Sequence, residues 1–237
     1  MKLLEILLAV TIISGCAKKQ TVPVKQPVKP DTTINGQQIT YLALGDSYTI
    51  GESVPAAQNF PNQLAARLNQ LGYKAAAPEI IARTGWTTDN LIDGIKSRDV
   101  KGEFNVVTLL IGVNNQYRRY DINTYRPEFA ALLKTAVQYA GGDRKHVFVV
   151  SIPDYSVTPF ARGSDKEKIA REIDEYNAIA KEEAEKLIIS YTDITTISRN
   201  AAFDPDLIAG DGLHPSGKMY GQWVELLLPK VSEQLKK

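Results

Sequence analysis

Residues 39–47 read Ile-Thr-Tyr-Leu-Ala-Leu-Gly-Asp-Ser, an apolar run that ends in a glycine-containing turn. A short apolar run closed by such a turn is typical of a buried strand. Residues 60–71 follow with leucines at helical spacing, Pro61 in the first turn and Gly72 directly after the last. Proline is favoured where a helix begins and glycine where it ends, so the sequence predicts a strand followed by a helix.

The same alternation continues to the end of the chain. Further strands are expected at residues 77–82, 105–111, 146–152 and 187–191, and further helices at residues 129–140, at residues 164–187 with Ser164 and Glu167 as a capping box, and from near Ser216. The run Asn105–Ile111 is apolar enough to be buried on both faces, which indicates a central strand. Strands that alternate with helices predict an α/β fold, with a mainly parallel five-stranded sheet covered by helices on both faces.

Composition places the chain among ordinary globular proteins. Its 237 residues are 43% hydrophobic and 23% charged, which is enough for one sizeable core and does not require two domains. The formal net charge is +1, and no block of basic residues stands out. Binding of nucleic acid depends on a concentrated basic face, so nucleic acid is not expected as a partner.

The first fifteen residues are expected to form a signal peptide. Lys2 precedes an apolar stretch, Leu3–Ile13, that is much shorter than the ~20 residues of a membrane-spanning helix. The stretch ends in Ile13-Ser14-Gly15-Cys16, which resembles the lipobox of bacterial lipoproteins. That resemblance implies cleavage before Cys16 and a lipid anchor on this cysteine. The alternative is a signal peptide with ordinary cleavage and a stray thiol.

Residues 17–31 carry spaced prolines and lysines without a hydrophobic period. Such a composition favours an extended, solvated spacer over a packed element. The expected organisation is therefore a signal peptide at residues 1–15, a lipid-anchored tether at residues 16–36 and a folded domain at residues 37–237. A lipid anchor at Cys16 would hold the protein at a membrane of the bacterial cell envelope.

Two turns carry the residue types of nucleophilic catalysis. Ser47 directly follows the first expected strand, and Asp211-Gly212-Leu213-His214 precedes the last helix. A serine hydroxyl becomes a good nucleophile when an imidazole takes its proton, and a carboxylate can orient that imidazole. Ser47, His214 and Asp211 are therefore the candidate catalytic residues, although Asp211 alone could serve only to cap its turn. The other histidine, His146, opens a strand at the opposite edge of a parallel sheet and is interpreted as structural or surface-exposed.

Four blocks of the sequence together resemble those of the SGNH, or GDSL, hydrolase family. The blocks are Leu44-Gly45-Asp46-Ser47-Tyr48-Thr49-Ile50-Gly51, Arg83-Thr84-Gly85-Trp86, Gly112-Val113-Asn114-Asn115 and Asp211-Gly212-Leu213-His214-Pro215. The resemblance spans residues 39 to about 228. It implies a three-layer, flavodoxin-like sandwich and hydrolysis of esters through an acyl-serine intermediate. The third block of the family usually ends in aspartate, and Asn115 departs from that pattern.

The resemblance also implies an oxyanion hole, made by the backbone amides of Ser47 and Gly85 and the side-chain amide of Asn114. Each of these residues follows an expected strand, and the carboxyl ends of parallel strands meet at one edge of a sheet. Taken singly, Gly85 is as readily a turn former, and Asn114 a loop residue that bonds its own backbone. Asp46 is interpreted as a cap that orients the loop.

The loop after Asn114 contains Tyr117, Arg118 and Arg119, which are expected at the rim of the site. Arginine and tyrosine can recognise phosphate, carboxylate or sugar hydroxyls, so this loop is a candidate specificity element, with a merely solvated loop as the alternative. Tyr48 and Trp86 either line an acyl pocket or pack in the core. One unassigned histidine and no cysteine cluster leave little material for a metal site, and neither metal nor cofactor is expected.

The sequence thus points to a serine esterase, with lysophospholipids, acyl esters and acetylated carbohydrates all open as substrates. An acyltransferase that uses an envelope acceptor in place of water is one alternative. A non-catalytic envelope- or carbohydrate-binding module on the same fold is another, because a fold by itself does not specify an activity.

Overall fold

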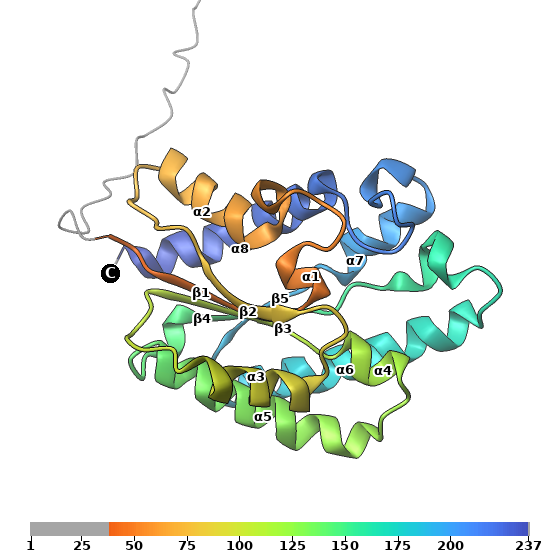
Figure 1. Cartoon of the computed structure of the whole chain (residues 1–237), viewed down its shortest axis with the longest axis horizontal. Coiled ribbons are helices and arrows are strands. Elements are labelled where there is room, and N and C mark those ends of the chain that lie inside the picture. Colours follow the sequence, from red (N-terminus) through yellow and green to blue (C-terminus); the bar gives the residue numbers. More distant parts are fainter. Residues whose placement is uncertain (1–37, 237) are drawn as a thin grey trace, which may run out of the picture.

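A five-stranded parallel sheet forms the centre of the molecule in the computed structural model, which describes residues 38–236 (Figure 1). Its strands lie in the order β2-β1-β3-β4-β5, and every neighbouring pair is parallel. They are β1 (Tyr41–Asp46), β2 (Glu79–Arg83), β3 (Val106–Leu110), β4 (Val147–Val150) and β5 (Ser190–Thr192). The predicted α/β fold is confirmed, and β3, buried along its whole length, is the predicted central strand.

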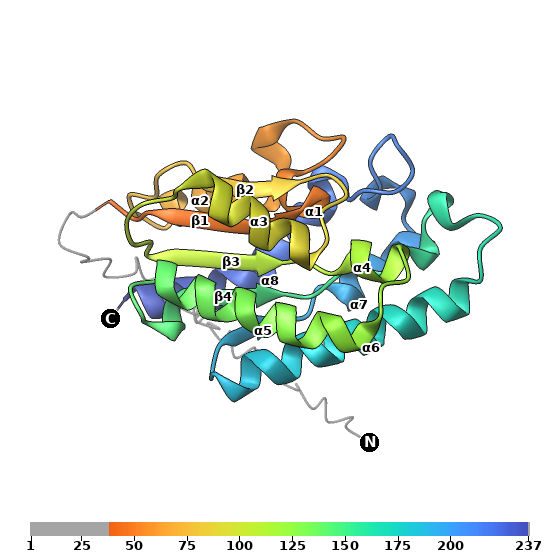
Figure 2. The ribbon, with the colours of Figure 1, turned by 60° about the horizontal axis from the view of Figure 1, so that its bottom comes forward.

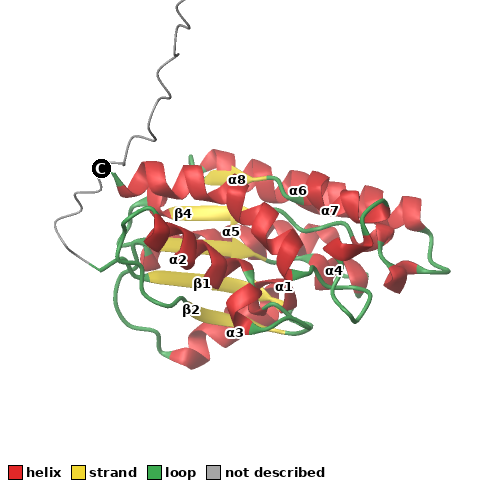
Figure 3. Cartoon of the chain, turned by 90° about the horizontal axis from the view of Figure 1, so that it is seen from above, coloured by secondary structure: helices red, strands yellow, loops and turns green. Residues whose placement is uncertain are grey.

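Helices cover both faces of the sheet and give the predicted three-layer sandwich (Figure 1, Figure 3). One layer contains α2 and α8, which pack against each other, and the other contains α3, α5 and α6. The α-helices are α1 (Ser47–Ile50), α2 (Phe60–Gln70), α3 (Thr88–Arg98), α4 (Val113–Tyr117), α5 (Ile122–Tyr139), α6 (Lys166–Lys186), α7 (Thr195–Arg199) and α8 (Gly217–Leu235). Short 3-10 turns occur at Ala56–Gln58, Arg144–His146, Tyr155–Val157, Pro159–Ala161, Asn200–Ala202 and Pro205–Leu207.

Side-chain caps explain where the long helices begin. The Ser216 hydroxyl accepts a hydrogen bond from the Met219 amide, so α8 begins next to the predicted residue. The capping box expected at Ser164 and Glu167 is wrong. Asp165 caps α6 instead, because its carboxylate accepts the hydrogen bond from the Lys168 amide. A carboxylate is as good an N-cap as a hydroxyl, and sequence spacing alone did not distinguish the two neighbours.

Two helices differ from the expected pattern in other ways. Helix α5 begins at Ile122 instead of residue 129, because Asp121 caps it and Pro127 is accommodated inside it. Helix α3 was not expected at all. Its apolar contacts with the core are the buried Leu91 and Ile95 and the half-buried Ile92, too few to produce a clear helical period in the sequence.

All five strands point their carboxyl ends toward the same edge of the sheet, as Figure 2 shows for the strands that it labels. Helix α1 follows β1 directly at this edge, and α4 follows β3 after a two-residue connection. His146 lies directly before β4, at the opposite edge. The parallel arrangement therefore gathers the loops that carry the candidate site residues and leaves His146 away from them.

The expected signal peptide, tether and lipidated Cys16 lie outside the described residues and stay predictions. Within residues 38–236, no helix has both the length and the apolar character needed to cross a membrane.

Candidate active site

The turn after β1 brings Ser47 to the edge of the sheet. Asp46 caps α1, since its side chain accepts a hydrogen bond of 3.0 Å from the Tyr48 amide, which confirms the interpretation of Asp46 as a cap. Glycine is required at position 45, because a Cβ there would lie 2.1 Å from Thr49 Oγ1 and 2.4 Å from the Leu110 carbonyl oxygen. Burial raises the pKa of Asp46 to about 7, although two backbone amides lower it in part.

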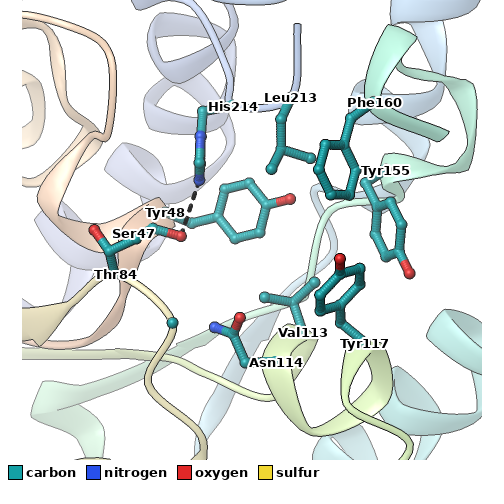
Figure 4. A pocket seen from close by; sticks show the side chains of 11 residues that line it. Ser47, Tyr48, Thr84, Val113, Asn114, Tyr117, Tyr155, Phe160, Leu213 and His214 are labelled. Carbon is teal, nitrogen blue, oxygen red and sulfur yellow. Dashed lines mark hydrogen bonds between the residues drawn. The ribbon is translucent and has the colours of Figure 1, made fainter. Parts of the chain in front are cut away.

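A chain of hydrogen bonds joins three of the predicted residues (Figure 4). The Ser47 hydroxyl oxygen lies 3.0 Å from His214 Nε2, and His214 Nδ1 lies 2.6 Å from Asp211 Oδ2. The side chain of Ser47 comes from the start of α1 and that of His214 from the loop before α8, 167 positions later. The imidazole is buried and meets the ring of Tyr48 edge-on. Tertiary structure therefore brings the two turns together as expected.

The two carboxylate oxygens of Asp211 have different partners. Oδ1 accepts hydrogen bonds from the backbone amides of Leu213 and His214, which shapes the turn, whereas Oδ2 faces the imidazole. The two interpretations of Asp211, turn cap and partner of the histidine, are thus both met by one side chain. The Ser53 hydroxyl also donates to Oδ2, at 2.7 Å, and sequence reasoning missed this contact.

Burial raises the pKa of the Asp211 carboxyl, but hydrogen bonds from His214, from Ser53 and from the two backbone amides outweigh that effect and hold the pKa well below its usual range. The carboxylate therefore stays ionised at neutral pH. Ser53 is found in the left-handed backbone region, with φ of 65°, an uncommon conformation for a serine.

Gly85 and Asn114 lie beside Ser47 and His214 in the lining of one cavity. Gly85 follows β2 with a φ of 79°, a conformation that favours glycine. Asn114 belongs to the first turn of α4, and its Nδ2 donates a hydrogen bond of 2.9 Å to the Trp86 carbonyl oxygen. An amide nitrogen carries two hydrogens, and Figure 4 shows this nitrogen on the side of the cavity where Ser47 lies. The four residues expected to meet at the sheet edge therefore do so.

The cavity has a volume of about 130 Å³ and is mainly apolar away from these polar groups. Its remaining lining residues are Tyr48, Thr84, Val113, Tyr117, Tyr155, Phe160 and Leu213. Tyr48 thus lines the pocket, whereas Trp86 packs over Gly94, where an added Cβ would lie 2.2 Å from the indole ring. Tyr155 and Phe160 were not singled out in the sequence, because they belong to an irregular loop without a periodic pattern.

The model of the GDSL-like lipase/acylhydrolase family matches residues 43–222. The chain belongs to this family. The family resemblance of the four sequence blocks is thereby confirmed, and the protein is an ester-hydrolysing enzyme. No curated protein matches the chain in sequence.

Solved structures share the fold of this GDSL hydrolase. A lipase/acylhydrolase from Enterococcus faecalis is 16% identical with a TM-score of 0.64, covering 82% of this chain and 96% of that one. The esterase EstA from Pseudoalteromonas sp. is 15% identical with a TM-score of 0.62, and the match covers 84% of this chain and 99% of EstA. The acetylxylan esterase Axe2 from Geobacillus stearothermophilus is 20% identical with a TM-score of 0.59, and the match covers 83% of this chain and 94% of Axe2. At these identities the likeness concerns the fold alone.

Asn115 replaces the usual aspartate of the third GDSL block with an amide that still holds the loop. Its Oδ1 accepts a hydrogen bond of 3.1 Å from the Thr88 amide, and its Nδ2 donates one of 2.7 Å to Thr88 Oγ1. The Thr88 hydroxyl in turn donates to Glu128. The side chain of Asn115 is fully buried, so these bonds tie α4 to the start of α3 away from water.

We expect Asn115→Asp to destabilise this GDSL hydrolase by about 1–3 kcal/mol, the cost of leaving a buried polar group unsatisfied. The Thr88 hydroxyl has one proton to donate and Glu128 takes it, so a second carboxylate would face an oxygen without a hydrogen. Denaturant unfolding at pH 8 measures the loss. The double variant Asn115→Asp with Glu128→Gln should recover much of it, and an unchanged midpoint in Asn115→Asp would contradict this account.

The loop after Asn114 is placed at the rim, as expected, but its three residues differ in position. The ring of Tyr117 lines the cavity, and the Arg118 guanidinium donates a hydrogen bond of 2.6 Å to the Gly85 carbonyl oxygen. Arg119 is exposed and does not line the cavity. Within residues 38–236, no three acidic, histidine or cysteine side chains group so that they could hold a metal ion.

Proposed function

We propose that this hydrolase is a serine esterase in which Ser47 is the nucleophile and His214 the general base. The observation that carries the proposal is the continuous hydrogen-bonded chain from Ser47 Oγ through the imidazole to Asp211, with bond lengths of 3.0 and 2.6 Å. Its open end faces an apolar cavity that Asn114 and Gly85 also line. The names of the structural neighbours, which include a lipase/acylhydrolase and two esterases, are consistent with this chemistry.

The geometry suggests the order of events. As Ser47 Oγ forms a bond to the ester carbonyl carbon, its proton passes to His214 Nε2. The ionised Asp211 stabilises the imidazolium that results and holds the ring in one tautomer. The carbonyl oxygen gains negative charge and is stabilised by N–H groups of Ser47, Gly85 and Asn114, each worth about 10² to 10³ in rate.

The proton that His214 took from Ser47 is then passed to the leaving group. The bond from carbon to the leaving oxygen breaks, and that oxygen takes the proton from His214 Nε2 as the alcohol departs. A water molecule then attacks the acyl-serine while Nε2 accepts its proton, and the carboxylic acid leaves as Ser47 regains its hydrogen.

Labelling with an alkyl phosphonate ester tests the proposal. EstA, one of the structural neighbours, was solved inhibited by monoethylphosphonate. We expect peptide mass spectrometry of the treated hydrolase to find the adduct on Ser47, with loss of esterase activity in proportion to labelling. An adduct on any other serine would overturn the assignment. Product analysis with added alcohols separates hydrolysis from acyl transfer, and an absence of turnover on every short-chain aryl ester would favour the binding-module alternative.

We propose that Arg118 positions the Gly85 loop, because its guanidinium holds the Gly85 carbonyl oxygen. Arg118→Ala is expected to lower kcat/KM about tenfold for anionic and neutral esters alike, since a hydrogen bond from a charged group is worth about 1.5 kcal/mol at the lower end of its range. Steady-state kinetics on a matched pair of esters measures this, with Arg119→Ala for comparison. A loss confined to the anionic ester would show that the loop recognises substrate charge.

We also propose that Cys16 carries a lipid anchor that holds the hydrolase in the bacterial envelope. The motif Ile13-Ser14-Gly15-Cys16 supports this, and so does the tether composition that follows it. Metabolic labelling with an alkyne fatty acid should tag the wild-type chain and leave the Cys16→Ser variant untagged. Equal labelling of both would overturn the proposal.

A further inference from the structure

The cavity beside Ser47 has two unlike halves (Figure 4). One half holds the polar groups, with His214 and Asn114 on opposite sides of the Ser47 hydroxyl. The other half is walled by aliphatic and aromatic side chains from four separate segments, namely Tyr48, Val113, Tyr117, Tyr155, Phe160 and Leu213. The apolar half therefore begins where the reacting groups end.

Three aromatic rings form the outer wall of the apolar half. The ring centres of Tyr117 and Phe160 are 5.8 Å apart, and each lies 6.2 Å from the ring centre of Tyr155. The Tyr155 hydroxyl donates a hydrogen bond of 2.9 Å to Gln116 Oε1, so its polar atom is already satisfied within the protein. Rings in contact at these distances make a continuous apolar surface.

This wall remains partly open to water. Phe160 is 46% exposed and Tyr117 is 55% exposed, although both are large side chains next to a cavity. Contiguous exposed apolar surface of this kind is a mark of a ligand-binding groove. An apolar part of a substrate lying against the two rings would remove that surface from water.

The wall is also fixed relative to the reacting groups. The Phe160 amide donates a hydrogen bond of 2.9 Å to the Gly212 carbonyl oxygen, in the same turn that holds His214. The preceding turn is anchored by the buried Asp154 carboxylate, which accepts a hydrogen bond of 2.8 Å from Arg199 Nε. The backbone at Phe160 is therefore tied directly to the turn that carries His214.

The positions of the polar groups around Ser47 indicate which part of a bound ester would enter the apolar half of the cavity. The carbonyl oxygen must face Asn114 and Gly85, and the leaving oxygen must face His214 Nε2, which lies on the other side of the Ser47 hydroxyl (Figure 4). The remaining substituent of the carbonyl carbon is the acyl chain. The direction left for it leads between Leu213 and Phe160 on one side and Val113 and Tyr117 on the other.

We propose that this apolar half, bounded by Phe160 and Tyr117, is an acyl-chain subsite that selects chains of about four to six carbons over acetyl groups. The inference rests on the proposed esterase function and narrows its substrate class. The whole cavity, its polar half included, has a volume of about 130 Å³, close to that of an apolar cavity that takes up a benzene-sized molecule. It therefore has room for the ester group and a short chain, and an acetyl methyl group would leave much of it unfilled. Acetylated sugars would leave the aromatic wall unused.

A series of p-nitrophenyl esters with acetyl, butyryl and hexanoyl chains tests the subsite, because the leaving group is the same in all three. We expect kcat/KM, corrected for the hydroxide-catalysed rate of each ester, to rise by up to about fourfold for each methylene enclosed. A flat or falling profile in the wild-type enzyme would overturn the proposal. If no ester shows Ser47-dependent turnover, the proposed function fails and the subsite with it.

Phe160→Ala tests the wall itself. We expect the ratio of hexanoate to acetate kcat/KM to fall about fivefold to tenfold, because the chain would lose an enclosing ring. Phe160→Leu should keep part of the ratio, since it restores an apolar wall. Phe203→Ala is the matched control, as Phe203 is 91% exposed and does not line the cavity, and it should leave both the ratio and the acetate rate unchanged. A ratio unaltered in Phe160→Ala, with thermal unfolding as in the wild type, would overturn the assignment.

Discussion

Ser47→Ala is expected to lower kcat of this GDSL hydrolase by about 10⁶-fold, the scale seen when the nucleophile of a serine hydrolase is removed. The change deletes the oxygen that lies 3.0 Å from His214 Nε2 and that would bond to the carbonyl carbon. It leaves the backbone amide of residue 47 in place, so stabilisation of the oxyanion is retained. The residual rate above the uncatalysed reaction measures what the oxyanion donors supply without a nucleophile.

The fold should tolerate this substitution. Helix α1 is capped by Asp46 and not by Ser47, so its first turn keeps its hydrogen bond to the Tyr48 amide. Circular dichroism and thermal unfolding of Ser47→Ala should match the wild type. Ser97→Ala, an exposed serine on α3, is a control that should keep full activity. Turnover above about one per cent of wild type in Ser47→Ala would contradict the nucleophile assignment.

His214→Ala is expected to have an effect of similar size, about 10⁶-fold in kcat, because nucleophile and base act as one unit. Among residues 38–236, His214 Nε2 is the side-chain partner of the Ser47 hydroxyl, and without the imidazole the remaining partner of Asp211 Oδ2 in that range is the Ser53 hydroxyl. The backbone of the turn should survive, since Asp211 Oδ1 still accepts the amides of residues 213 and 214. Single-turnover kinetics on p-nitrophenyl butyrate measures the loss.

The chain supplies its own control for this experiment. It has only two histidines, and His146 lies directly before β4, at the edge of the sheet opposite the cavity. His146→Ala should therefore keep wild-type kcat and KM. If the two variants lose activity equally, the imidazole of His214 is not the base.

The family resemblance singled out Ser47, Gly85, Asn114 and His214, and their convergence could be predicted from where each lies between the expected strands and helices. Apolar runs and helical stripes predicted the alternation of strands and helices, and a parallel sheet gathers the loops at its carboxyl edge. The proximity of the four residues could therefore be predicted without knowing how the side chains pack. Helix α3 escaped prediction because its apolar stripe is short, and the cap of α6 was assigned to Ser164 although Asp165 provides it.

The aromatic wall and the second contact of Asp211 could not be predicted in this way. Tyr155 and Phe160 lie in an irregular loop, and Ser53 lies in the turn after α1, where no period or motif marks them. Their roles depend on which distant segment each one meets. The same holds for Asn115, whose amide was seen in the sequence only as a departure from aspartate and proves to hold Thr88, 27 positions away.

Local patterns in the sequence predict the five strands, helices α2, α5, α6 and α8, and the edge of the sheet at which the polar residues gather. These follow from periodicity and turn chemistry, which are properties of neighbouring residues. The shape of the cavity, the pairing of Ser53 with Asp211 across 158 positions and the direction left open for an acyl chain depend on how the chain folds in three dimensions. Those features arise from packing between segments far apart in the chain, and a local pattern carries no information about the distance at which such segments meet.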